Sequence, residues 1–261
     1  MTTSTTRADI RFLRKIEARV LGTRVHGLSR AQTVAWIDAL LSTDSKAHIA
    51  TVNPEIIMRA RRDSQFRRIL ENTHLNVADG IGVVLAARLQ RHTMPERVTG
   101  IDLVNDLASL AVRRAYKLML VGGAPGVADE AGAVLQRNHP GLLPPTTHIG
   151  TPKASGDSEA RDTLKRCDPH LVLVAYGAPA QEQWIERNLA GFSSIVGIGV
   201  GGALDYISGR VARAPNPIRK AGLEWMFRLS REPWRWRRMR ALPVFACLAI
   251  REAIHKRDGQ A

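Results

Sequence analysis

Residues 76–82 read NVADGIG, in which an apolar approach ends at the carboxylate of Asp79 and is followed by a glycine and an apolar, helix-like run. An aspartate on such a turn can cap a helix, because its side chain accepts hydrogen bonds from the unpaired amides of the first turn. A carboxylate in the same place can instead act as a general base that takes a proton from an attacking hydroxyl. The stretch alone favours the cap, so the choice depends on what else the chain brings to this position.

Several other small and polar residues also follow apolar stretches that are typical of strands. In an open parallel sheet, ligands bind outside the carboxyl ends of the strands, where the following helices direct their amide-rich N-termini at one crevice. We therefore expect these residues to share one rim with Asp79. They are Thr51, Asn53, the pair Gly122 and Gly123, Gly177 and the glycines between positions 197 and 202.

The glycine-rich stretches match known phosphate-binding patterns only weakly. GIGVGG at 197–202 formally fits G-x-G-x-x-G, and GGAPG at 122–126 joins a strand to a helix. No clear acidic residue follows to hold an adenosine ribose, so a Rossmann-type nucleotide-binding oxidoreductase is an alternative and not the main interpretation. Glycines also let helices pack close to strands, which is a purely structural explanation. The chain has no G-x-x-x-x-G-K-[ST] loop, which argues against a P-loop nucleotide hydrolase.

Two further side chains are expected near the rim. Arg97 precedes a helical run, where its guanidinium could reach a diphosphate or pair with Glu96 on the surface. Gln181 falls in the first turn of a predicted helix, a position where a lone glutamine is usually solvated. The eight histidines show no metal-ligand spacing and there is no D-x-D pair, so we expect no metal and no other cofactor.

The elements that must position these residues alternate between strand and helix patterns through the first 210 residues. Helix starts are recognisable at Ser29 with Gln32 as a capping box, at Asn53 followed by Pro54, and at Pro179. The alternation predicts an α/β fold with an open, mainly parallel, Rossmann-like sheet and helices on both faces. The predicted strands are 48–53, 74–80, 117–123, 170–177 and 194–202, and residues 141–157 are expected to form a surface loop.

The chain has 261 residues, of which 44% are hydrophobic, enough for one large domain with an appendage. We divide it into an α/β catalytic domain, 1–210, and a basic helical C-terminal appendage, 211–261. Neither cysteine lies in a C-x-x-C or Cys/His cluster, so no disulfide framework or zinc site is expected. The first residues lack a secretory pattern and no apolar run is long enough to span a bilayer, so we expect a cytoplasmic protein.

The positive charge is concentrated in the appendage. The formal net charge is +14, and from Val211 onward 12 Lys/Arg stand against 4 Asp/Glu. Such a bias indicates an anionic partner, which could be nucleic acid, an anionic lipid surface or a phosphorylated substrate. Residues 225–257 interleave Trp, Phe and Leu with Arg and Lys, and the apolar run 241–250 is too short to span. We expect this segment to lie at a membrane surface, with nucleic-acid binding as the alternative.

Eight sequence blocks occur together and in order: TVNPE (51–55), ADG (78–80), ERVTG (96–100), VGGAPGV (121–127), P-x-Q-E-x-W-I (179–185), GVGGALD (199–205), RAP (213–215) and GLEWMFRL with EP (222–233). Over roughly residues 20–245 the chain resembles the WecG/TagA/CpsF glycosyltransferase family. The resemblance implies transfer of N-acetylmannosamine, its uronic acid or glucose from a UDP-sugar to a polyprenyl-diphosphate-linked saccharide. It further implies inversion at the anomeric carbon, no metal, and a role in cell-surface polysaccharide or teichoic acid synthesis.

The resemblance also assigns roles to positions of this chain. It makes Asp79 the candidate base and puts Thr51 beside the reacting sugar. The positions that line the UDP-sugar pocket in the family correspond to Asn53, Arg97, Gln181 and Asp205. The arginines expected to close over the diphosphate correspond to Arg228, Arg235 and Arg238. The chain departs from the family pattern at Ala180, where many members have lysine, and at 150–152, where many have a Gly-Tyr-Phe element.

This chemistry is consistent with the residue types themselves. An inverting transfer needs one carboxylate to take the proton of the attacking hydroxyl and a cationic or amide-rich cradle for the leaving UDP. Without a metal, arginines must stabilise the diphosphate. The expected partners are thus a UDP-sugar, a polyprenyl-diphosphate-linked acceptor and an anionic membrane surface, with the protein peripheral on the inner face of the cell membrane and no nucleic acid bound. The oligomeric state is left open, with a homo-oligomer as one option.

Overall fold

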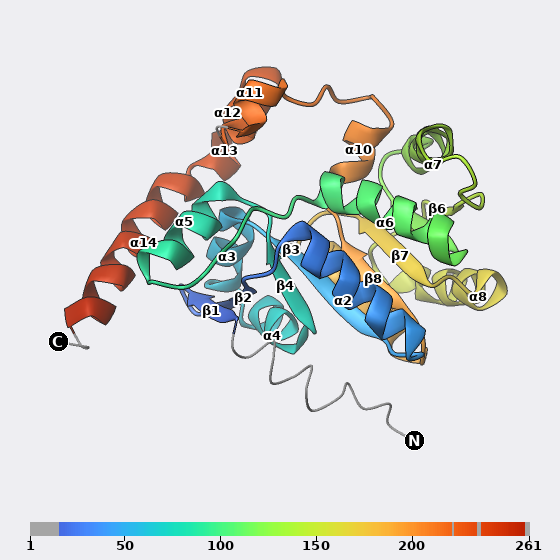
Figure 1. Cartoon of the computed structure of the whole chain (residues 1–261), viewed down its shortest axis with the longest axis horizontal. Coiled ribbons are helices and arrows are strands. Elements are labelled where there is room, and N and C mark those ends of the chain that lie inside the picture. Colours follow the sequence, from blue (N-terminus) through green and yellow to red (C-terminus); the bar gives the residue numbers. More distant parts are fainter. Residues whose placement is uncertain (1–15, 221, 234–235, 259–261) are drawn as a thin grey trace.

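The computed structural model describes residues 16–220, 222–233 and 236–258, without the side chains at 220, 237, 238, 257 and 258. Within these ranges, one mixed sheet of strand order β1-β2-β4-β3-β8-β7-β5-β6 forms the centre (Figure 1). Only the β1–β2 pair is antiparallel among the described pairings. The strands are β1 Glu17–Val20, β2 Thr23–His26, β3 Ala47–Val52, β4 Leu75–Ala78, β5 Leu118–Gly122, β6 Thr146–His148, β7 Leu171–Ala175 and β8 Val196–Gly199.

Helices cover both faces of the sheet because the strands carry apolar side chains on both. In β5, for example, Leu118 and Leu120 face one core cluster while Met119 and Val121 face another, as the two-residue period of a strand requires. The helices that follow the N-terminal hairpin are α2 Arg30–Ser42, α3 Pro54–Ala60, α4 Ser64–Asn72, α5 Ile81–Leu89, α6 Gly100–Arg114, α7 Val127–Asn138, α8 Asp157–Cys167 after the 3₁₀ turn η1 Ala154–Gly156, α9 Ala180–Leu189 and α10 Ala203–Ile207.

Three groups of helices contribute to three core clusters. Helices α2, α6, α7 and α10 pack on one face of the sheet. On the other face, α3, α4, α5 and α14 cover the side of β1 and β2, and α8 and α9 cover β5 and β7. The C-terminal helices are α11 Asn216–Lys220, α12 Glu224–Arg231, α13 Trp236–Met239 and α14 Ala241–Asp258.

The parallel strands end nearly level with one another, and this register creates the rim. Val52 of β3 lies opposite Ala78 of β4, and Val174 of β7 lies opposite Gly199 of β8. The residues that follow these strand ends therefore share one edge of the sheet. Helix α10 lies at this edge and leads into α11–α13 (Figure 1).

The predicted fold class and the five predicted strands are confirmed. The capping box of Ser29 and Gln32 opens α2, Asn53 caps α3, and α9 begins after Pro179. The surface loop expected at 141–157 is wrong in part, because Thr146–His148 form the edge strand β6 against β5. The antiparallel hairpin of β1 and β2 was not predicted.

Helix α14 is packed into the same core as the α/β domain. Its own residues Phe245, Ala249 and Ala253 are buried, and α14 contacts α3 and α5. The Glu252 carboxylate accepts hydrogen bonds of 2.8 Å from the Leu21 backbone amide and from Gln90 Nε2. The division at residue 210 stays a prediction, since α14 shares core residues with the first segment. No helix in the described ranges is long and apolar enough to cross a bilayer.

Candidate active site

Asp79 lies directly after β4 and does not cap the following helix. The N-cap of α5 is Gly80, and α5 has no side-chain cap hydrogen bond, so the cap interpretation of Asp79 is wrong. The Asp79 backbone amide donates to the Val52 carbonyl at 2.8 Å, which ties the turn to the end of β3. The carboxylate is thus held at the rim without being used by the helix.

The surroundings of Asp79 raise the pKa of its carboxyl group to near neutral pH. Burial raises the pKa of Asp79 to about 7, against the opposing effects of the Arg97 charge and a hydrogen bond from the Gly100 amide. The negative charges of Glu224 and Asp102 raise the pKa further. The residue as a whole keeps part of its surface exposed. A general base works best with a pKa near the working pH, and Asp79 meets this condition.

Arg97 connects the rim to the C-terminal helices. Its Nη2 lies 2.7 Å from Glu224 Oε2 at the start of α12. Arg213 extends the network, with Nη2 at 2.8 Å from Asp102 Oδ1 and Nε at 3.5 Å from Glu224 Oε1. The surface pair of Arg97 with Glu96 is therefore wrong. These ion pairs hold the start of α12 against Arg97, which lies just before α6, and against Arg213, which is itself paired with α6.

Arg228 and Asp205 meet above Gly202, just beyond the end of β8. The Arg228 guanidinium lies over the Tyr206 ring at 5.0 Å and 3.4 Å from Glu232. A Cβ atom on Gly202 would lie 3.1 Å from Arg228 Nη2 and 3.4 Å from Asp205 Oδ2. Two of the predicted site residues, from segments on either side of residue 210, thus meet at the rim. Arg235 lies outside the described residues, and so does the side chain of Arg238.

Thr51 and Asn53 hold the end of β3 in place. The buried Thr51 hydroxyl donates to the Gly199 carbonyl at 2.7 Å, which joins β3 to the end of β8. Asn53 Oδ1 accepts from the Ile56 amide at 3.0 Å and caps α3. A Cβ atom on Gly80 would lie 3.5 Å from Asn53 Cβ, so Asn53 lies against the residue that follows Asp79. Contact of either side chain with a sugar stays a prediction.

Gln181 is fully buried, so the expectation of a solvated glutamine is wrong. Its Oε1 accepts from the amides of Gly177 at 3.1 Å and Gly201 at 3.0 Å, and its Nε2 donates to Glu182 Oε1 at 2.8 Å. One side chain therefore fastens the glycine turns after β7 and β8. Its contact with a ligand stays a prediction, whereas its positioning of the two turns follows from these bonds.

Glu182 was missed in the sequence. It is completely buried, and burial raises the pKa of its carboxyl to about 7. Within the described part of the chain, its Oε2 has no hydrogen-bond partner. The helical spacing in the sequence could have indicated its burial, because Glu182 shares a face of α9 with the apolar Ile185 and Leu189. Its observed task is to accept from Gln181 and fix the orientation of that amide.

The glycines at 197 and 199 serve packing and do not cradle a dinucleotide. A Cβ atom on Gly197 would clash with Leu189, and one on Gly199 would lie 2.5 Å from Gln181 Nε2. Both glycines thus admit α9 onto β8, which removes the support for an oxidoreductase. On the other side of the rim, Arg210 pairs with Glu130 at 2.7 Å beside the GGAPG loop. Among the described residues, no His, Cys, Asp and Glu cluster could hold a metal ion.

The α/β sheet thus carries at its rim a carboxylate of raised pKa together with Arg97 and Arg228, the side-chain types that acid–base chemistry on a phosphate-linked substrate uses. Residues 18–259 match the model of the Glycosyl transferase WecG/TagA/CpsF family, and the chain belongs to this family. The resemblance drawn from the eight sequence blocks is thereby confirmed.

Three curated relatives share the name N-acetylglucosaminyldiphosphoundecaprenol N-acetyl-beta-D-mannosaminyltransferase. The protein of Bacillus subtilis (strain 168) is 32% identical over 219 residues, covering 81% of this chain and 82% of the relative. That of Bacillus spizizenii (strain ATCC 23059 / NRRL B-14472 / W23) is 32% identical over 211 residues, covering 81% of each. That of Staphylococcus aureus (strain MW2) is 29% identical over 231 residues, covering 87% and 89%.

Proposed function

We propose that this protein transfers N-acetylmannosamine from a UDP-linked donor to N-acetylglucosaminyl-diphospho-polyprenol, with inversion and without a metal. The observation that carries the proposal is the Asp79 carboxylate, with a pKa of about 7 at the rim, next to Arg97 and within the family pattern. The shared name of the relatives, which specifies an N-acetyl-β-D-mannosaminyl product and a lipid-linked N-acetylglucosamine acceptor, supports this donor sugar over its uronic acid or glucose.

The transfer is a single displacement at the anomeric carbon. The acceptor hydroxyl attacks this carbon, the bond to the diphosphate oxygen breaks, and UDP leaves with the electron pair. Asp79 takes the hydroxyl proton as the new bond forms, because a carboxylate with a pKa near neutrality is ionised in part and gains proton affinity in its buried surroundings. If the donor diphosphate is α-linked, one displacement gives the β product in the name of the relatives.

The leaving diphosphate needs positive charge that is already in place. Arg97 and Arg228 supply it from two sides of the rim, since bidentate guanidinium–phosphate contacts are strong and geometrically specific. Arg97 is paired with Glu224 and Arg228 with Glu232. A bound diphosphate therefore competes with two carboxylates, and this competition links donor binding to the position of α12. Arg235 and Arg238 are proposed to join this cradle.

Donor positioning depends on the turns after β7 and β8. We assign Thr51, Asn53 and Asp205 to the sugar and ribose side of the pocket and Gln181 to the support beneath it. The bond from Thr51 to the Gly199 carbonyl and the two bonds accepted by Gln181 support this division, because they fix the backbone that a donor would contact.

A polyprenyl acceptor requires the enzyme to work at a membrane surface. We propose peripheral attachment to the inner face of the cell membrane through the C-terminal helices. The exposed Trp225 and Met226 of α12 and Trp236 of α13 support the proposal, since aromatic and basic residues together are typical of interfacial helices.

The test is a transfer assay with a panel of UDP-sugars. Purified protein is mixed with each donor and a short-chain N-acetylglucosaminyl diphosphate lipid, and UDP release is measured. We expect turnover with UDP-N-acetylmannosamine that depends on the acceptor. Turnover with another donor alone would overturn the sugar assignment, and UDP release that is independent of the acceptor would overturn transfer.

A further inference from the structure

A groove lies at the edge of the sheet opposite the rim. Helix α3 begins at the rim and ends at Ala60, so Arg61 is carried to the far edge. The turn at Leu21, before β2, lies at the same edge, because β2 runs parallel to β4. These two segments and α14 line an open pocket of about 500 Å³. A second pocket of about 420 Å³ shares Leu21 and Arg61 and extends the groove to Arg67.

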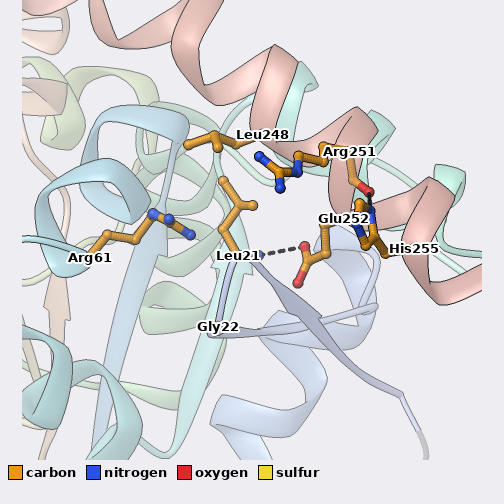
Figure 2. A pocket seen from close by; sticks show the side chains of 7 residues that line it. All are labelled: Leu21, Gly22, Arg61, Leu248, Arg251, Glu252 and His255. Atoms are coloured by element: carbon orange, nitrogen blue, oxygen red, sulfur yellow. Dashed lines mark hydrogen bonds between the residues drawn. The ribbon is translucent and has the colours of Figure 1, made fainter.

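The groove combines unpaired cations with apolar walls. Figure 2 shows Arg61 and Arg251 on either side of Leu21, with Leu248 beside them. In the described part of the chain, Arg61, Arg67 and Arg251 form no ion pair. Arginines without a carboxylate partner at one groove indicate an anionic ligand.

The carboxylates of the groove do not neutralise these arginines. Glu252 is held by the Leu21 amide, by Gln90 and, at 3.6 Å, by Lys256. Glu71 lines the second pocket together with Arg67, and the ion pairs of the described residues include none between these two. The segment 59–68, RARRDSQFRR, contains five arginines and one acidic residue, and that residue, Asp63, accepts from the Phe66 amide as a helix cap. Arg61 and Arg67 of the groove thus belong to an arginine-rich segment of the chain.

The solvent side of α14 is apolar next to the groove. Val244, Ile250 and Ile254 are 45%, 50% and 51% exposed, whereas Phe245 and Ala249 on the other side of the helix are buried. A helix that is apolar on both sides still exposes apolar surface to solvent when only one side is packed on the core. Its 18 residues extend about 27 Å, from α13 toward the far edge of the molecule (Figure 1).

We propose that the groove of Arg61, Arg67 and Arg251 binds the phosphates of anionic phospholipids while the exposed side of α14 rests on the lipid. The membrane then runs along α14, so that the rim and the far edge both touch it. A bilayer offers anionic headgroups and an apolar layer side by side, whereas a nucleic acid or an acidic protein offers no apolar layer for Ile250 and Ile254. The inference rests on the proposed function, because a lipid-linked acceptor brings the enzyme to a membrane.

The test uses vesicle flotation of the full-length protein without donor or acceptor. Wild type and the triple variant R61Q/R67Q/R251Q are compared on phosphatidylcholine vesicles with and without phosphatidylglycerol. Each basic residue at an anionic surface strengthens binding about five-fold, so we expect the triple variant to lose on the order of 100-fold in partitioning on the anionic vesicles. The control, R113Q/R137Q/K165Q, removes the same charge from exposed positions of α6, α7 and α8, on the other side of the molecule (Figure 1), and should lose only a few-fold.

A second variant tests the apolar contribution. I250Q/I254Q should weaken vesicle binding by a factor that does not change with salt, whereas the arginine contribution should shrink as salt rises. Equal losses in the two triple variants, or wild-type binding by R61Q/R67Q/R251Q, would overturn the groove as a lipid site. Wild-type protein that binds duplex DNA and ignores anionic vesicles would also overturn it.

Transfer to a soluble acceptor analogue separates this inference from the proposed function. Both triple variants should transfer sugar to the analogue as wild type does, because none of the changed residues lies at the rim. Failure of all proteins to transfer would refute the proposed function and leave the vesicle result standing. Normal transfer with unchanged vesicle binding would refute the groove alone.

Discussion

Replacing Asp79 by asparagine should abolish transfer and, at the same time, stabilise the protein. The amide keeps the shape of the carboxylate and can still accept from Gly100, but it cannot take a proton. Loss of a general base lowers turnover by roughly 100- to 10,000-fold, while UDP-sugar affinity should change little. The gain in stability arises because burial makes the ionised carboxylate unfavourable, and asparagine carries no charge.

The magnitude of the stabilisation follows from the pKa. The pKa of Asp79 is raised from 3.8 to about 7, so the folded state binds more protons than the unfolded state between these values, and wild-type stability falls as pH rises through them. The full shift would lower the free energy of unfolding of the wild type by roughly 4 kcal/mol above about pH 7. Local relaxation around the ionised carboxylate reduces this cost, and we expect a gain of about 2–3 kcal/mol for D79N, or roughly 4–10 °C in Tm for a chain of this size.

The assay is thermal unfolding of D79N and wild type across pH. The difference in Tm should grow between about pH 4 and pH 7 and then level off. Asp157→Asn provides the control, because a hydrogen bond from Arg187 lowers the pKa of Asp157. This variant should have a lower Tm than wild type at neutral pH, and the difference should disappear as acid protonates Asp157 in the wild type. A Tm gain for D79N that is absent at high pH would refute the raised pKa, and near-normal turnover would refute the base assignment.

Three further substitutions probe the rim. Gln181→Leu removes the acceptor of the partly buried Gly177 and Gly201 amides and the donor to the buried Glu182 carboxylate, so urea denaturation should show a loss of roughly 2–4 kcal/mol. Glu224→Gln removes a charge that raises the pKa of Asp79, so the acidic limb of the pH profile of kcat/KM should move to lower pH; an unmoved limb would contradict the coupling. Arg228→Ala should raise the KM for the UDP-sugar by about 10- to 100-fold, and an unchanged KM would remove Arg228 from the diphosphate site.

Much of the fold could be predicted because its central strands are buried on both faces and end in glycine or polar residues. The β1–β2 hairpin escaped this criterion, since EARV and TRVH carry Glu17, Arg19 and Arg24 and are short. Its turn at Leu21 and Gly22 has positive φ at both residues, and a leucine in the sequence gives no indication of positive φ. The buried residues of β2 include the polar Thr23 and His26, so a search for continuous apolar runs does not reveal this strand.

The candidate site could be predicted only in its local part. Asp79 was recognisable because it follows a strand, but its partner network depends on long-range docking. Arg97 and Glu224 are separated by more than a hundred positions in the chain, and no periodicity indicates that α12 returns to this turn. The C-terminal segment looked like a detachable appendage because its charge and aromatic content differ from the rest. The burial of Phe245 and Ala249 instead means that deleting it would expose part of the core.

Analysis of the reaction product tests the central claim most directly. Wild-type protein is incubated with UDP-N-acetylmannosamine and a short-chain N-acetylglucosaminyl diphosphate lipid in excess EDTA, and the linkage formed is determined by NMR. We expect a β-linked N-acetylmannosaminyl-N-acetylglucosaminyl diphosphate lipid from wild type and about 1% of that amount or less from D79N in the same time. An α-linked product, or no disaccharide until a divalent metal is added, would contradict it.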